Sequence, residues 1–302
     1  MKRRLVTSAI ALLLLAACSR HASPALSPQP AAPPAPLADG TPQITDSADG
    51  VHIEYQVYGQ REPAIILIHG WANNANYWNA QLEPLKTRYT VVTLNLAGHG
   101  ASERNREEWL MANYAADVVA VARAIPNRQL VLVGHAMGAI VALEATRKLG
   151  KRVIGIIAVD SLKSIGQPPM PKAQFDELVK PFRTDFIGHM HEFVAQYLFS
   201  KDADPAFVRK VAQDMAHVSP QVAVPSLEAL YRYDFSALPE IHVPIIAINS
   251  DLHMTTDDAR IKRYAPTFRS IVVPGAGHFL MMESPQRFNP LLLQAIDSLT
   301  GP

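Results

Sequence analysis

Short runs of apolar residues recur along the chain, and segments with helical patterning separate them. Continuous apolar runs of this kind are typical of parallel strands covered on both faces. Their alternation with helices predicts a parallel sheet between two helical layers, with ligands bound beyond the carboxyl ends of the strands. The predicted strands are residues 64–68, 89–94, 130–133, 153–159, 244–248 and 269–273, and the predicted helices include 77–85, 112–125 and 285–299.

Two segments depart from this alternation. Residues 51–59 alternate between apolar and polar, which predicts an antiparallel edge strand at the start of the globular domain. Residues 164–238 hold no buried-strand pattern but several helical ones, at 175–182, 186–199, 205–217 and 226–231. We therefore expect an α/β core formed by residues 43–163 and 239–302, into which residues 164–238 are inserted as a helical lid.

The amino terminus has the pattern of an export signal. Lys2, Arg3 and Arg4 precede an apolar stretch that is shorter than the ~20 residues needed to span a bilayer. The stretch ends in Leu15-Ala16-Ala17-Cys18, which resembles a bacterial lipobox and implies lipidation of Cys18; an ordinary signal peptide cleaved nearby is the alternative. Ser19 follows rather than Asp, which by resemblance to sorted lipoproteins favours the outer membrane, facing the periplasm. Residues 19–42, rich in Pro and Ala, then read as a disordered tether.

Composition and charge indicate which kinds of molecule the protein could bind. The chain of 302 residues carries 28 basic and 27 acidic side chains, a formal net charge of +1. This balance gives no basic surface for nucleic acid, so a small molecule is the expected ligand. The single cysteine, Cys18, excludes an internal disulfide and a cysteine-rich metal site.

The segment Gly134-His135-Ala136-Met137-Gly138 joins an apolar strand to an apolar helix. Its two glycines have the spacing of the Gly-x-Ser-x-Gly nucleophile elbow, a turn so sharp that it exposes the central side chain at the edge of the sheet. Here the central residue is Ala136, so the turn lacks the nucleophilic oxygen. The simpler alternative is that the glycines merely permit a tight turn.

Three further motifs follow predicted strands: His69-Gly70, Gly98-His99-Gly100-Ala101-Ser102 and Gly275-Ala276-Gly277-His278. Together with the elbow, and in this order, they resemble the α/β-hydrolase superfamily over residues 51–299. The resemblance implies an eight-stranded, mostly parallel sheet with helices on both faces and a lid between strands six and seven. It also implies a triad in the order nucleophile, acid, histidine.

The same resemblance implies roles for particular residues. His278 takes the place of the general base, and Ala136 that of the nucleophile. For the acid we favour Asp251, which follows the seventh strand, and keep Asp160, which follows the sixth, as the alternative. The backbone amides of Trp71 and Met137 would form the oxyanion hole.

The sequence predicts a site without cofactor or metal. His69, His99 and His135 belong to separate motifs, and none has the paired spacing of a zinc site. The pocket is expected to be apolar and to suit a small ester, lactone or similar acyl compound. Candidate lining residues are Trp71, Trp78 and Trp109 and the apolar side chains of the lid, namely Met170, Phe175, Phe182, Phe186, Met190, Phe193, Tyr197 and Phe199.

Two residues depart from the family pattern, Ala136 and Asn95, the latter at a position where Asp is common. Loss of a serine nucleophile costs on the order of 10⁶ in kcat. Three interpretations stay open: a hydrolase that lacks its nucleophile, by natural loss or by mutation; an enzyme that uses His278 as a base without a covalent intermediate; and a non-catalytic binding protein. Methylketone synthases, decarboxylases of this fold with alanine at the nucleophile position, offer an analogy for the second.

Overall fold

The computed structural model describes residues 38–301, whose centre is one twisted sheet. The strand order is β1-β2-β4-β3-β5-β6-β7-β8. Strands β1 and β2 are antiparallel to their neighbours, and all later pairs are parallel. The expected eight-stranded, mostly parallel sheet is therefore confirmed. Its strands are β1 (Gln43–Asp46), β2 (His52–Tyr58), β3 (Ala64–Ile68), β4 (Thr90–Leu94), β5 (Leu130–His135), β6 (Val153–Val159), β7 (Ile245–Ser250) and β8 (Phe268–Val273).

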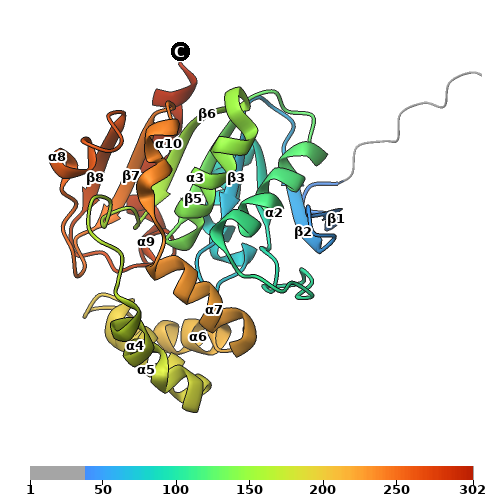
Figure 1. Cartoon of the computed structure of the whole chain (residues 1–302). Helices are drawn as coiled ribbons and strands as arrows, with labels where there is room; N and C mark the ends of the chain where they lie inside the picture. Colours follow the sequence, from blue (N-terminus) through green and yellow to red (C-terminus); the bar gives the residue numbers. More distant parts are fainter. Residues whose placement is uncertain (1–37, 302) are drawn as a thin grey trace, which may run out of the picture. The chain divides into compact units, whose positions relative to one another are not determined.

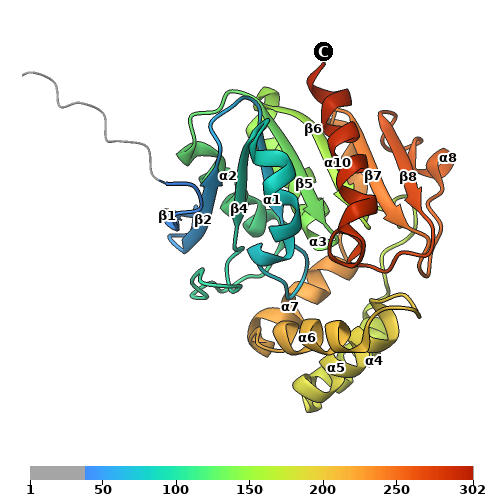
Figure 2. The same ribbon diagram turned by 180° about the vertical axis from the view of Figure 1, so that it is seen from behind.

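Burial explains why the central strands read as continuous apolar runs. Every residue of β3, β4, β5 and β7 is buried, because helices cover both faces of the sheet. Helices α1 and α10 pack on each other on one face (Figure 2), and α2 and α3 pack on each other on the opposite face (Figure 1). These helices are α1 (Asn79–Lys86), α2 (Met111–Ala124), α3 (Met137–Leu149) and α10 (Pro285–Thr300), with short helices α8 (Asp258–Ile261) and α9 (Leu280–Glu283) near the last strand.

Four helices lie between β6 and β7 in the sequence and form a group below the sheet in Figure 1. The last of them begins at Pro220, earlier than the helical pattern at 226–231 indicated, because Pro220 can occupy the first turn of a helix. They are α4 (Lys172–Thr184), α5 (Phe186–Tyr197), α6 (Pro205–Met215) and α7 (Pro220–Tyr231). Within residues 38–301, no helix combines the length and the apolar character needed to cross a bilayer.

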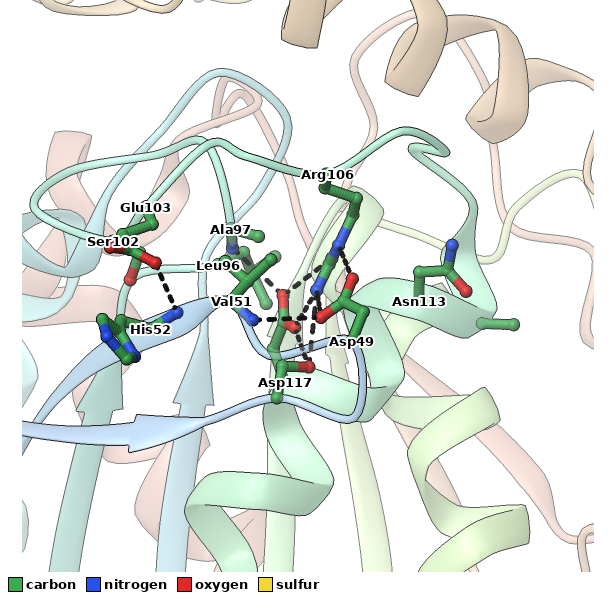
Figure 3. Close-up of polar contacts among 12 residues, drawn as sticks. Asp49, Val51, His52, Leu96, Ala97, Ser102, Glu103, Arg106, Asn113 and Asp117 are labelled. Atoms are coloured by element: carbon green, nitrogen blue, oxygen red, sulfur yellow. Dashed lines mark hydrogen bonds and ion pairs between the residues drawn. The ribbon is translucent and has the colours of Figure 1, made fainter.

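The loop that follows β4 is fastened to the core by a buried ion pair (Figure 3). The Arg106 guanidinium contacts the carboxylate of Asp117 in α2. Its Nε also lies 2.6 Å from Oδ2 of Asp49. Asp117 also accepts hydrogen bonds from the Ser47 hydroxyl (2.6 Å) and the Ala97 amide (3.0 Å). The network therefore fixes the loop that carries the second of the strand-end motifs.

The predicted export signal, residues 1–18, lies outside the described residues, and so does most of the predicted tether. Residues 38–42 are the only part of that tether within the described range. The description begins just ahead of β1, which pairs with β2 at the antiparallel edge of the sheet. The antiparallel pairing of β2 agrees with the alternating pattern of residues 51–59, but the expectation that this segment forms the edge of the sheet is wrong, because β2 pairs with β1 on one side and with β4 on the other.

Candidate active site

Strand β5 turns into helix α3 at Ala136, which has φ 48° and ψ −114°. A non-glycine residue rarely adopts a positive φ and is strained there, so the turn must be held by its surroundings. A side chain at Gly134 would overlap the backbone of Gly138, and one at Gly138 would overlap the carbonyls of Ile68 and His69. The two glycines thus allow helix, strand and neighbouring loop to approach closely, which is the geometry of a nucleophile elbow.

His278 lies near Ala136, and both residues line the same cavity. The carboxylate beside its ring is that of Asp160: Nδ1 of His278 donates to Oδ2 of Asp160 over 2.6 Å. The expectation that Asp251 would take this place is therefore wrong. Asp251 is exposed and accepts a hydrogen bond from the Gly275 amide (2.8 Å), so it holds the turn that precedes His278.

Asp160 is fixed from several sides at the end of β6. Its Oδ1 accepts from the amide and the hydroxyl of Ser250, at 2.9 and 2.8 Å, and lies 2.8 Å from Nζ of Lys163. Burial by itself would raise the pKa of this carboxyl, but the hydrogen bond and charge of His278 and the charge of Lys163 outweigh it and hold the pKa of Asp160 well below its usual range. Asp160 is thus ionised and can orient the imidazole through Nδ1.

The amides of Trp71 and Met137 meet two requirements of an oxyanion hole. Both residues line the cavity beside Ala136. Among residues 38–301, neither amide donates a hydrogen bond to a protein acceptor, so both remain available for a ligand. The Trp71 indole is engaged elsewhere, because its Nε1 donates to the Ala223 carbonyl of α7 at 2.8 Å. This side chain therefore ties the loop after β3 to helix α7.

The other three motif histidines support the loops around the site. Nδ1 of His69 donates to the Gly70 carbonyl and its Nε2 accepts from the Leu96 amide. His99 donates through Nδ1 to the Ala97 carbonyl, and His135 donates through Nε2 to the His278 carbonyl, both over 2.9 Å. Within residues 38–301, no group of three His, Cys, Asp or Glu side chains could hold a metal ion.

A cavity of about 670 Å³ lies between Ala136, the Asp160–His278 pair and the inserted helices. We call it the lid-covered cavity. Trp71 lines it, whereas Trp78 and Trp109 are buried in the core. Most of the expected lid aromatics pack the helices together instead, and Phe175 and Phe182 are fully buried. The apolar lining residues include Ile140, Leu162, Met170, Phe193, Leu227 and Leu230.

Sequence reasoning missed several polar residues of this cavity, among them Lys163 and Asn73. Lys163 lies three positions after Asp160, a spacing that could have suggested an ion pair once Asp160 was taken as the acid. The positive charge of Lys163 balances the negative charge of Asp160, so the pair brings no net charge to the cavity. The site therefore combines an apolar enclosure, an oriented imidazole and free backbone donors.

The chain also resembles known proteins in sequence. The sequence pattern described as "Alpha/beta hydrolase family" matches residues 65–291. The chain is also 28% identical over 250 residues to the Escherichia coli protein named "Putative carbamate hydrolase RutD", an alignment that covers 78% of this chain and 92% of that protein.

Solved structures share the fold at lower sequence identity. A thermophilic esterase from Thermogutta terrifontis superposes with a TM-score of 0.74 at 22% identity, covering 86% of this chain and 100% of the esterase. A bromoperoxidase from Bacillus anthracis superposes with a TM-score of 0.75 at 18% identity, covering 85% and 100%. The names of these proteins indicate different activities. Structural similarity at this level therefore shows the fold, and the substrate must be argued from the site.

Proposed function

The chain belongs to the alpha/beta hydrolase family, and within that family we propose that it binds small apolar esters or related acyl compounds at a hydrolytic site that lacks only the nucleophilic oxygen. The observation that carries the proposal is the His278–Asp160 hydrogen bond of 2.6 Å in a cavity that Ala136 also lines. The apolar lining favours an apolar ligand, and the paired charges of Asp160 and Lys163 favour a neutral one.

The missing oxygen limits what the chain with Ala136 does with such a ligand. In a serine hydrolase the histidine removes the proton of the serine hydroxyl, which then attacks the carbonyl carbon. Ala136 offers no such oxygen, and removal of a nucleophile of this type lowers kcat on the order of 10⁶-fold. The amides of Trp71 and Met137 would still polarise a bound carbonyl.

The test is to supply the oxygen with Ala136→Ser and to measure hydrolysis of p-nitrophenyl butanoate. Since the imidazole and the carboxylate are already paired, we expect the esterase kcat to rise by at least ~10³-fold over the parent. The matched control is the double variant Ala136→Ser/His278→Ala, which should return to the parental rate. A folded Ala136→Ser protein that stays at the parental rate would contradict the proposal.

A second candidate is an enzyme in which His278 acts as a base without a covalent intermediate. It is favoured by the fact that the His278–Asp160 pair is complete although Ala136 occupies the nucleophile position. Turnover of an acyl substrate such as a β-keto acid by the parent protein, abolished by His278→Ala, would support this candidate over the first.

We also propose that the protein is an exported lipoprotein anchored in the membrane through Cys18. The support is the sequence Leu15-Ala16-Ala17-Cys18 after a basic and apolar segment. The Pro- and Ala-rich residues 19–42 would then separate the hydrolase-fold domain from the bilayer.

A further inference from the structure

Lys163 is the only lysine or arginine among residues 38–301 that lines the lid-covered cavity. It lies in the loop after β6, and its Nζ is 2.8 Å from Oδ1 of Asp160. Both side chains are largely shielded from solvent, with 11% of Lys163 and 6% of Asp160 exposed. Water and salt screen a shielded pair only weakly, so the charge of Lys163 acts strongly on its neighbours.

The ammonium group of Lys163 is held in place by further acceptors. Its Nζ donates to Oγ of Ser250 and to the carbonyl of Leu252, both over 3.4 Å. Ser250 in turn donates to the same Asp160 oxygen that Lys163 contacts. Because these partners come from the ends of both β6 and β7, the ammonium cannot leave the carboxylate without losing several contacts.

The Asp160 carboxylate lies between two groups that can carry a positive charge. Its Oδ1 contacts Lys163, and its Oδ2 accepts from Nδ1 of His278 over 2.6 Å. A carboxylate favours the protonated form of an imidazole beside it, whereas a nearby cation disfavours that form. An ammonium on the same carboxylate therefore opposes protonation of the ring.

Other titratable side chains near His278 belong to neighbouring elements: His135 in β5, Asp251 and His253 after β7, and Glu283 in α9. The rings of His135 and His278 pack with 4.5 Å between their centroids, but burial, together with His278, lowers the pKa of His135 to about 3, so His135 is neutral. In the part of the chain that the structure describes, none of these side chains forms a hydrogen bond or ion pair with Asp160. Lys163 is therefore the charge that balances this carboxylate.

We propose that Lys163 is a positioning residue that balances the charge of Asp160 and so opposes protonation of the His278 imidazole, which keeps the ring available as a base. The consequence for catalysis rests on the proposed function, in which the imidazole takes the proton of a hydroxyl at position 136. Without the ammonium, the carboxylate would hold the ring in its protonated form up to a higher pH.

The first test compares Lys163→Gln with Lys163 in the Ala136→Ser background, with p-nitrophenyl butanoate as substrate. The glutamine amide can still donate a hydrogen bond to Asp160 but has no charge. We expect the midpoint of the acid limb of kcat/KM to rise by about 1 pH unit, while the plateau at higher pH changes by less than about threefold. A purely structural role would lower the plateau and leave the midpoint unchanged.

The matched control is Lys172→Gln in the same background. Lys172 is an exposed lysine that pairs with Asp176 within α4, away from Asp160, so its removal should change neither the midpoint nor the plateau.

Protonation of the ring can also be measured without turnover, on the chain with Ala136. An NMR titration follows the His278 ring resonance, which is identified by its absence from His278→Ala. Its midpoint should lie about 1 pH unit higher in Lys163→Gln than in the parent. Lys163→Met, which lacks both the charge and the hydrogen bond, gives the same comparison if Lys163→Gln does not fold.

The outcomes separate this inference from the proposed function. A higher midpoint in both the kinetic and the NMR titration supports the role of Lys163. If the ring titrates alike with and without the lysine charge, or if the acid limb of an active Ala136→Ser enzyme does not move, the inference is overturned. If Ala136→Ser is inactive but the ring titration shifts as expected, the proposed function fails and the charge balance stands.

Discussion

Asp160 and His278 are 118 positions apart in the chain, and the Asp160 carboxylate reaches the His278 ring across the end of a strand that lies between them. Asp160 directly follows β6, and His278 follows β8, so β7 separates the two. The end of β7 is used as a support, because the amide and hydroxyl of Ser250 both donate to Oδ1 of Asp160. The other carboxylate oxygen, Oδ2, is thereby directed at Nδ1 of His278.

This relationship predicts that the acid of the restored enzyme is Asp160. In the Ala136→Ser background, Asp160→Asn should lower kcat for p-nitrophenyl butanoate by about 10⁴-fold, because the amide no longer stabilises the histidine tautomer and its cation. Asp251→Asn is the matched control and should change kcat by less than about tenfold, since Asp251 contacts the Gly275 amide and not the ring. Equal losses in the two variants would contradict the assignment.

The buried ion pair behind the site predicts a large effect on stability. Arg106→Met leaves the buried carboxylate of Asp117 without its cation, so the free energy of unfolding in urea should fall by about 3–5 kcal/mol. The double variant Arg106→Met/Asp117→Asn removes both charges and should recover much of this loss. Arg104→Met, at an exposed position in the same loop, should lie within about 0.5 kcal/mol of the parent.

If the double variant proves less stable than Arg106→Met alone, the charge of Asp117 is not the origin of the loss. The hydrogen bonds that Asp117 accepts from Ser47 and Ala97 would then be the important ones.

Much of the fold could be predicted because its determinants are local. Buried parallel strands require continuous apolar runs, and the elbow requires small residues at Gly134 and Gly138, where a side chain would overlap the backbone. Both signals are visible in the sequence without knowledge of distant contacts.

The choice between Asp160 and Asp251 is not local. Both residues follow strands, so spacing alone fits either, and the outcome depends on Ser250 and Lys163, which hold the Asp160 carboxylate. The sequence also does not show which lid aromatics line the cavity and which pack the helices. Phe175 and Phe193 both belong to apolar helical patterns, yet of these two only Phe193 lines the lid-covered cavity. Such distinctions arise from packing between elements, which a pattern within one element does not contain.

The proposed lipid anchor predicts that Cys18 governs the fractionation of the full chain. Expressed in a Gram-negative host, the protein should sediment with membranes and carry a lipid-dependent mass increase. Cys18→Ala should release it to the soluble fraction, because the proposed lipid is attached through the Cys18 thiol. Ser19→Ala is the control and should remain with the membranes. A parent protein found soluble and without added lipid mass would contradict the anchor.

The buried histidines predict a specific loss of stability in mild acid. Burial lowers the pKa of His99 to about 4 and, with the neighbouring His278, that of His135 to about 3, whereas an unfolded histidine titrates near ~6.5. Between these pH values the unfolded state binds more protons than the folded state. The contribution of these histidines to the free energy of unfolding is therefore fully present above pH ~6.5 and is lost as the pH drops toward 4.

The contribution of His99 can be isolated by removing its ring nitrogens. His99→Phe loses the hydrogen bond to the Ala97 carbonyl and should be somewhat less stable at pH 7. Its further loss of unfolding free energy between pH 7 and pH 4.5 should be smaller than that of the parent by roughly 2 to 3 kcal/mol, because one protonation linked to unfolding is gone. His242→Gln, at an exposed position, is the control and should keep the parental pH dependence. Urea unfolding at the two pH values measures both quantities, and a His99→Phe protein with the parental dependence would show that His99 titrates alike in the folded and unfolded states.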